Sequence, residues 1–137
     1  MARDVYHNHV KRALEKDGWR ITHDPFELEF GSSAYKIDLG AEGLVGAERQ
    51  GQRIAVEVKS FLGRSLQHQL HEAVGQFTNY KVLLEEVEPE RVIYLAVTRE
   101  VFEALFELPF ARLIRQRTEL RLIVFNPVLE EVTLWNP

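Results

Sequence analysis

Alternating apolar and polar positions in the first part of the chain predict a series of short strands. Trp19 to His23 and Phe26 to Phe30 are separated by Asp24-Pro25, which is a turn signal. A second turn at Gly31 to Ser33 leads into Tyr35 to Leu39. Because side chains alternate across a strand, each of these segments presents one apolar face to a core.

Two more strands, Leu44 to Glu48 and Arg53 to Lys59, flank the dipeptide Gln50-Gly51, so a β-hairpin is expected there. A helix is expected before all of these strands, from Asp4 to Asp17, with Gly18 as its stop. The residues that would face inward from this helix are Val5, Val10, Ala13 and Leu14.

The second half of the chain has the longer periodicity of helices. Ser65 to Glu86 is the longest predicted helix, because its apolar residues recur at steps of three and four. These residues are Leu66, Leu70, Ala73, Val74, Phe77 and Leu84. Val92 to Val97 is almost wholly apolar, which is typical of a buried strand. The remaining expected elements are a helix from Glu100 to Arg117, interrupted near Pro109, and strands at Leu120 to Phe125 and Val132 to Trp135.

This order of elements predicts an α/β fold with a mixed central β-sheet that contains a hairpin and is flanked by helices. The length of 137 residues is ordinary for one domain, so residues 1–137 are expected to form a single domain. The absence of cysteine excludes disulfide frameworks, thiolate zinc sites and cysteine nucleophiles. Neither a signal peptide nor a membrane-spanning run is apparent, and the expected location is cytoplasmic.

The formal net charge of −4 argues against a protein that grips DNA by charge alone, because phosphate neutralisation supplies most non-specific affinity. Basic residues nevertheless gather near the two ends of the chain. These are Lys11, Arg12, Lys16 and Arg20 at the start, and Arg112, Arg115, Arg117 and Arg121 near the end. The preferred interpretation of each cluster is an ordinary solvated helix face.

The residues best suited to chemistry are two carboxylates and a lysine. Alternation places Glu57 and Lys59 on the same face of the strand Arg53 to Lys59, and Asp38 lies on a second alternating strand upstream. Two carboxylates can converge on Mg²⁺, which prefers oxygen ligands, and a lysine beside them can offset charge on a phosphate. The alternative interpretation is a polar strand surface with an ion pair of little energetic value.

The predicted hairpin does not bring these groups together directly. With a two-residue turn at Gln50-Gly51, Glu42 would face Lys59, and Asp38 would lie four residues further on, roughly 13 Å along a straight strand. A bend at Gly40 could close this gap. Glu42 is therefore a second candidate for the upstream metal ligand, with a cross-strand ion pair to Lys59 as its alternative role. If the site exists, the carboxyls of the two ligands should lie within about 6 Å.

Asp38 followed by Glu57-x-Lys59 resembles the motif of the PD-(D/E)XK nuclease superfamily, although Ile37 stands where that motif has proline. This resemblance implies a restriction-endonuclease-like fold and a Mg²⁺-dependent site, with Mn²⁺ as the alternative cation. Asp38 and Glu57 would be the metal ligands, and Lys59 would assist the attacking water. Gln76 and Tyr80, four residues apart on the long helix, resemble a Gln-x-x-x-Tyr pair found near the catalytic groups in some branches.

Other chemistries have weaker support. His7 and His9, and His68 and His71, are spaced closely, but the sequence offers no evident third ligand for zinc. No glycine-rich phosphate loop and no nucleophile elbow around a serine is present in the sequence.

Several longer blocks of the chain are similar to the XisH family, which is named for controlling excision of the fdxN element. The similar blocks are Lys16 to Pro25, Asp38 to Glu42, Ile54 to Gly63, Gly75 to Tyr80 and Glu88 to Val97. The resemblance implies a role in programmed DNA rearrangement, together with a recombinase and a small companion protein, XisI.

Two hypotheses follow from the sequence. The first is a Mg²⁺-dependent DNA endonuclease, favoured by the intact set of Asp38, Glu57 and Lys59. The second is a catalytically silent regulator that binds a partner on the same scaffold, favoured by the net charge of −4. The sequence leaves the DNA site and the oligomeric state open.

Overall fold

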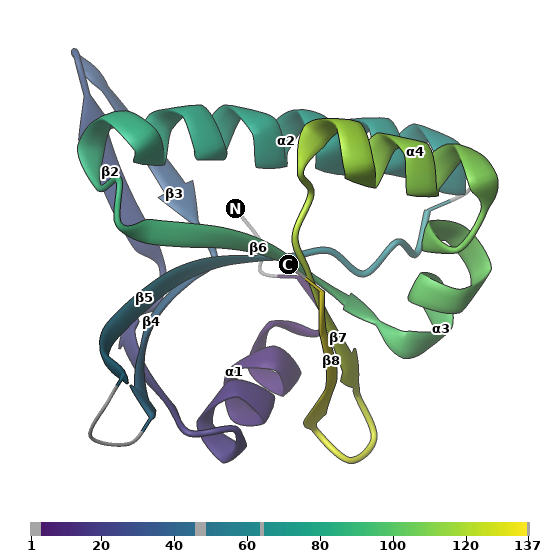
Figure 1. Ribbon diagram of the computed structural model, residues 1–137, viewed down its shortest axis with the longest axis horizontal. Coiled ribbons are helices and arrows are strands. Elements are labelled where there is room, and N and C mark those ends of the chain that lie inside the picture. The colour runs from purple at the N-terminus through teal and green to yellow at the C-terminus, as the bar shows by residue number, and fades with distance from the viewer. Residues whose placement is uncertain (1–3, 46–48, 64, 137) are drawn as a thin grey trace.

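The computed structural model describes residues 4–45, 49–63 and 65–136, and its main feature is a mixed β-sheet between helices (Figure 1). The strands are β1 (Trp19–His23), β2 (Phe26–Phe30), β3 (Ser33–Ile37), β4 (Leu39–Val45), β5 (Arg49–Val58), β6 (Arg91–Thr98), β7 (Leu122–Asn126) and β8 (Glu131–Asn136). The helices are α1 (His7–Lys16), α2 (Leu66–Val87), α3 (Arg99–Val101), the π-helix η1 (Phe102–Phe106) and α4 (Pro109–Thr118).

The central sheet has the strand order β1-β4-β5-β6-β7-β8, and β2 and β3 form a separate antiparallel ribbon. β5, β6 and β7 are parallel neighbours, while β4 and β8 join this parallel core in antiparallel fashion. The parallel strands are connected through helices, as parallel pairing requires. The predicted α/β fold with a mixed sheet and flanking helices is therefore confirmed.

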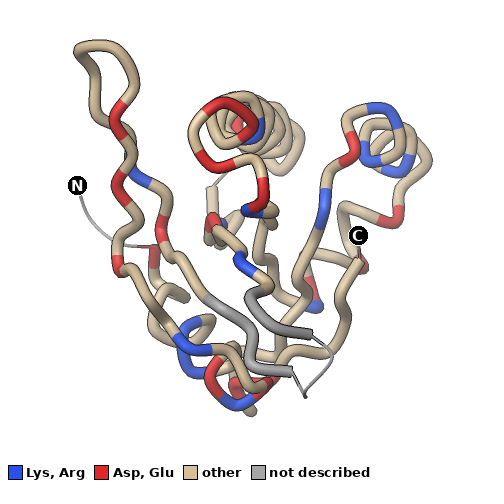
Figure 2. Tube along the Cα trace, turned by 60° about the vertical axis from the view of Figure 1, so that its left-hand side comes forward, with Lys and Arg blue, Asp and Glu red and all other residues tan. Residues whose placement is uncertain are grey.

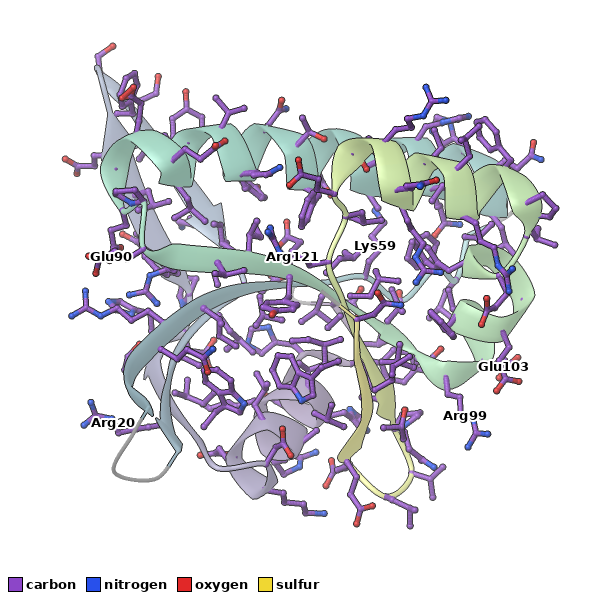
Figure 3. All side chains as sticks on the ribbon, in the orientation of Figure 1. Arg20, Lys59, Glu90, Arg99, Glu103 and Arg121 are labelled. Atoms are coloured by element: carbon purple, nitrogen blue, oxygen red, sulfur yellow. The ribbon has the colours of Figure 1, made fainter. Side chains whose placement is uncertain are left out.

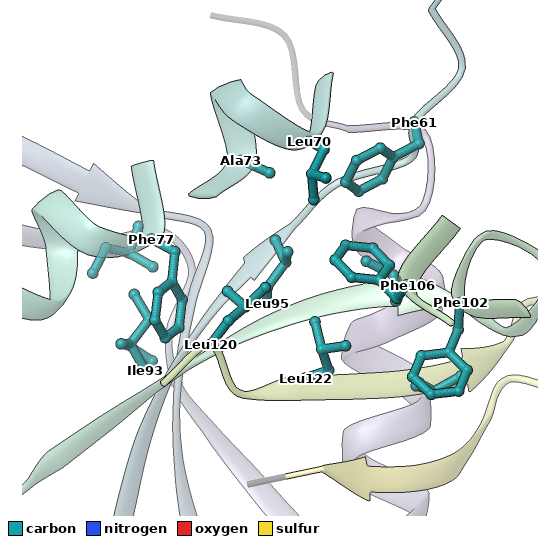
Figure 4. Packing of buried hydrophobic residues seen from close by; sticks show 14 of the residues in the cluster. Phe61, Leu70, Ala73, Phe77, Ile93, Leu95, Phe102, Phe106, Leu120 and Leu122 are labelled. Atoms are coloured by element: carbon teal, nitrogen blue, oxygen red, sulfur yellow. The ribbon is translucent and has the colours of Figure 1, made fainter. Parts of the chain in front are cut away.

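Two layers of apolar packing cover the two faces of the sheet. On one face, Phe77 of α2 lies beside Ile93 of β6 and belongs to a cluster that also contains Leu95 of β6 and Leu122 of β7 (Figure 4). On the other face, Leu14 of α1 belongs to a second cluster with the opposite side chains of β4, β5 and β7. Ser65 begins α2 as its N-cap, because its side chain accepts a hydrogen bond from the backbone N–H of His68.

The face assignment within β5 agrees with the sequence prediction. Ile54, Val56 and Val58 pack in the cluster that contains α1, whereas Ala55 packs on the side of α2. By the same alternation Glu57 belongs to the α2 side. The candidate carboxylate therefore projects into the space between the sheet and the long helix.

The expected hairpin turn is wrong. Gln50 and Gly51 lie inside β5, and the register pairs Glu42 with Arg53 and Leu39 with Val56. Residues 46–48, between β4 and β5, lie outside the described residues. Packing explains the difference, since the observed register sets buried residues of β4 directly opposite buried residues of β5.

The expected continuous strand from Tyr35 to Leu39 is also wrong, because it breaks at Asp38. The residues before the break belong to the β2–β3 ribbon, and those after it belong to the central sheet.

The first helix also differs from the prediction at its N-terminus. Val5 is exposed rather than inward, because α1 begins only at His7, whose side chain is buried.

Within the described ranges, no helix is long and apolar enough to cross a membrane.

Candidate active site

Asp38 and Glu57 meet where the ribbon joins the central sheet. The antiparallel β4–β5 register pairs Leu39 with Val56, so Asp38, one residue before Leu39, lies beside Glu57, one residue after Val56. The bend proposed at Gly40 is not what brings them together. Gly40 instead permits close packing, since a Cβ there would lie 2.7 Å from the ring of Phe26 and 3.0 Å from that of His23.

Backbone hydrogen bonds hold the two acidic residues in place. The N–H of Val58 donates to Oδ2 of Asp38 at 2.7 Å, and the N–H of Asp38 donates to Oε1 of Glu57 at 3.3 Å. The two carboxyl groups are also within hydrogen-bonding contact of each other. The structure therefore brings together Asp38 and Glu57, the two carboxylates chosen from the sequence as candidate metal ligands.

The surroundings of Glu57 favour its protonated form. Burial raises the pKa of this carboxyl to about 9, helped by its hydrogen bond to Asp38 and by the negative charge of Asp38. The positive charge of Lys59 acts in the opposite direction and lowers the pKa of Glu57. In the absence of a cation, the pair therefore holds one proton near neutral pH, as two closely placed carboxyls do.

Lys59 lies between the sheet and the helical layer, and its ammonium group contacts α2 (Figure 3). Nζ of Lys59 donates to Oε1 of Glu72 at 2.5 Å, and this bond lowers the pKa of Glu72. The lysine side chain is 19% exposed and that of Glu72 is 49% exposed. Lys59 is thus partly desolvated beside Glu57 and has one acidic partner that solvent can reach.

Tyr80 connects the carboxyl pair with a groove on the surface. Burial raises the pKa of its phenol, and the nearby charges of Glu57 and Asp38 raise it further. Gln76 and Tyr80 both line a groove of about 540 Å³ between α2 and the β2–β3 ribbon. Gln76 is exposed, and no contact joins it to Asp38 or Glu57 among those that the structure records. The structure therefore brings Tyr80 near the carboxyls and places Gln76 further out along the same helix.

Comparison with known proteins identifies the family. The model of the family described as "XisH protein" matches residues 1–133. This chain belongs to the XisH family. An XisH family protein from Nostoc punctiforme has a solved structure with a TM-score of 0.88 and 39% identity, covering 98% of this chain and 100% of its own. An fdxN element excision controlling factor protein from Anabaena variabilis has a TM-score of 0.88 and 43% identity, with the same coverage. No curated protein matches.

The carboxyl pair of this XisH family chain has the chemistry to hold a hard divalent cation. The buried Glu57 and the partly buried Asp38 supply two carboxylate groups, and a cation would replace the proton that they share. No group of three or more acidic or histidine side chains gathers at one point in the part of the chain that the structure describes. The remaining ligands would therefore be waters or phosphate oxygens, which Mg²⁺ commonly retains.

Glu42 does not take the position expected of an alternative ligand. Its backbone is paired with Arg53 rather than placed opposite Lys59, so the cross-strand pair expected between Glu42 and Lys59 is wrong. Of the closely spaced histidines, His7 is buried and bonded to Asp24 at 2.7 Å, while His68 is exposed and lies near Glu72.

Glu72 is the residue that the sequence analysis missed. It lies four residues before Gln76 and eight before Tyr80, so the three side chains follow one face of α2. This spacing was visible in the sequence. Its significance depends on how closely α2 approaches the end of β5, which is a property of the packed structure.

Proposed function

We propose that this XisH family protein controls programmed excision of a DNA element in the cytoplasm, through a PD-(D/E)XK-type site on a restriction-endonuclease-like scaffold. The substrate would be the phosphodiester backbone of DNA, and the cofactor Mg²⁺ or Mn²⁺. The observation that carries the proposal is the convergence of Asp38 and Glu57, with Lys59 directly after the end of β5 and close enough to lower the pKa of Glu57 by its charge. The name of the Anabaena variabilis relative supports the role in excision.

Each side chain has a separate task in this proposal. Asp38 and Glu57 would hold the cation, which supplies polarisation of the phosphate and a lowered pKa for a bound water. Lys59 would orient the attacking water and stabilise negative charge on the phosphate. Because Nζ of Lys59 is paired only with the half-exposed Glu72 in the recorded contacts, a phosphate could share or replace that partner.

Tyr80 and Gln76 would act at the periphery of this site. Tyr80 lies near enough to the carboxyls to feel their charge, so its hydroxyl could hydrogen-bond a phosphate oxygen beside them. Gln76 is exposed on the same helix and could contact the neighbouring backbone.

A second candidate function is a regulator without cleavage, acting with a XisI-like companion protein and a recombinase. The ion pair between Lys59 and Glu72 favours it, because a lysine neutralised by a carboxylate is less available to a phosphate. The same contact would then fix α2 to the end of β5 as a structural element.

Plasmid nicking tests the proposal directly. Supercoiled DNA would be incubated with the protein alone and with its companion protein, in the presence of Mg²⁺, Mn²⁺, Ca²⁺ or a chelator. The nuclease hypothesis expects nicking with Mg²⁺ or Mn²⁺ and none with the chelator. Ca²⁺ should allow binding with little cleavage, because its coordination is looser. If the companion is present and no condition yields nicked plasmid, the regulatory function is the one that remains.

DNA binding by the isolated chain is expected to be weak and strongly reduced by salt. Figure 2 shows acidic and basic residues interleaved over the chain, and several basic residues are already paired. Lys11 bonds Asp24, Arg12 pairs with Glu130, and Arg112 pairs with Glu107. Fluorescence anisotropy of a labelled duplex at two salt concentrations measures the effect. Tight binding that salt does not change would contradict this prediction.

A further inference from the structure

A groove lies between α2 and the β2–β3 ribbon. Its volume of about 540 Å³ lies within the range of ordinary ligand sites. The helix contributes Gln76, Asn79 and Tyr80, and the ribbon contributes Phe30 and Tyr35. Tyr80 lines the groove and is also within electrostatic reach of Asp38 and Glu57, so it is the residue that the groove shares with the surroundings of the carboxyl pair.

The ribbon supplies two exposed aromatic rings to this groove. The β2–β3 register sets Leu28 opposite Tyr35, and the same ribbon face carries Phe26 and Phe30. Phe26 and Leu28 are buried near the sheet, but the ribbon extends beyond α2, where Phe30 is 53% and Tyr35 is 40% exposed (Figure 1). The apolar face of the ribbon is thus buried at one end and exposed at the other, where the rings of Phe30 and Tyr35 are accessible to solvent.

The charge of the groove limits what it can bind. None of its described lining residues is a lysine or arginine, and Glu86 is the acidic residue among them. A DNA backbone would therefore find no counter-charge here. A nucleobase is neutral and has a face that stacks on aromatic rings and an edge that hydrogen-bonds to amides, and the groove offers both kinds of group beside the aliphatic side chains of Val82 and Leu83.

We propose that this groove binds an unpaired nucleobase, so that the substrate of the adjacent site is DNA with a single-stranded segment. The inference rests on the proposed function, because it names the substrate of the same site. Phe30 and Tyr35 would stack on the base, and Asn79 and Gln76 would hydrogen-bond to its edge. The phosphate of the same nucleotide would remain outside the groove, toward Lys59 and the carboxyl pair.

Binding in a chelator separates this inference from cleavage. Anisotropy at low salt would compare a labelled single strand, its blunt duplex and the same duplex with a central unpaired loop. The parent protein is expected to prefer the single strand and the looped duplex. Phe30→Ala and Tyr35→Ala should each weaken single-strand binding roughly tenfold or more, and should leave duplex binding unchanged. Phe110→Ala on α4 is the matched control, since Phe110 is also 53% exposed.

A gain-of-signal variant checks the stacking itself. Phe30→Trp retains an aromatic ring, so single-strand affinity should be kept, and fluorescence of the new indole should be quenched by the single strand but not by the duplex. Circular dichroism would verify that each variant is folded, as expected for changes at exposed positions.

Three results would overturn the inference. One is equal affinity of the parent for single-stranded and duplex DNA. Another is loss of affinity in Phe110→Ala equal to that in Phe30→Ala. The third is loss of companion-protein binding in the Phe30 and Tyr35 variants with single-strand affinity intact, which would make the groove a protein interface. Preferential single-strand binding without Mg²⁺-dependent nicking would refute the nuclease and support the groove. Nicking of duplex DNA by a protein that does not prefer single strands would support the nuclease and refute base binding in the groove.

Discussion

Lys59→Ala is expected to reduce Mg²⁺-dependent nicking by about a hundredfold or more while leaving metal binding largely intact. The positively charged side chain of Lys59 lies close enough to Glu57 to lower its pKa. Removal of one donor that stabilises charge in the transition state typically reduces the rate by about 10²–10³. The fold should survive, because the side chain is partly exposed and its partner Glu72 is accessible to water. The change in the free energy of unfolding should stay within about 1 kcal/mol.

Three further variants define the control set for this prediction. Glu57→Gln should lose both nicking and metal binding, because a neutral amide is a poorer ligand for a hard cation. Lys36→Ala removes an exposed lysine from the ribbon and should leave nicking unchanged. Glu72→Gln tests the ion pair, since release of Lys59 should maintain or increase nicking if Lys59 acts on the phosphate. Plasmid nicking and calorimetric Mg²⁺ titration would be measured on all variants. Full activity of Lys59→Ala would remove Lys59 from the mechanism.

The sequence predicted which residues form the site better than it predicted how the strands bring them together. Period-two alternation assigned Glu57 to the correct face of β5, because burial on the α1 side fixes Val56 and Val58 there. The turn at Gln50-Gly51 failed because a local turn preference was weaker than packing between β4 and β5. That single error produced the apparent distance between Asp38 and Glu57 and made Glu42 a candidate.

The protonation state of Glu57 could not be predicted from the sequence, for a different reason. A raised pKa at Glu57 requires its burial under α2 and its contact with Asp38, and both depend on tertiary structure. The partnership of Lys59 and Glu72 likewise joins β5 to a helix thirteen residues later. Motif spacing can select residue types for a reaction, whereas burial decides which of them share a proton.

The metal-free protein is expected to lose stability as pH rises, and Glu57→Gln should abolish that loss. Folded Glu57 has a pKa raised to about 9, against an ordinary value of 4.5. Between these values the folded chain keeps a proton that the unfolded chain has released, so the free energy of unfolding falls by up to about 1.4 kcal/mol per pH unit. The stabilising effect is complete below the ordinary pKa and is lost as pH rises through the raised one.

Urea denaturation in a chelator at about pH 6, 7 and 8 measures this effect as the difference between Glu57→Gln and the parent, which cancels titrations common to both. The variant should gain up to about 2.7 kcal/mol relative to the parent across this range. The lowered pKa values of Asp24, Glu72 and Glu130 add no slope here, because these carboxyls are ionised throughout it. Mg²⁺ should stabilise the parent more at pH 8 than at pH 6, since binding must displace the shared proton. Parallel pH profiles for parent and variant would show that Glu57 is already ionised without metal and that the carboxyls share no proton.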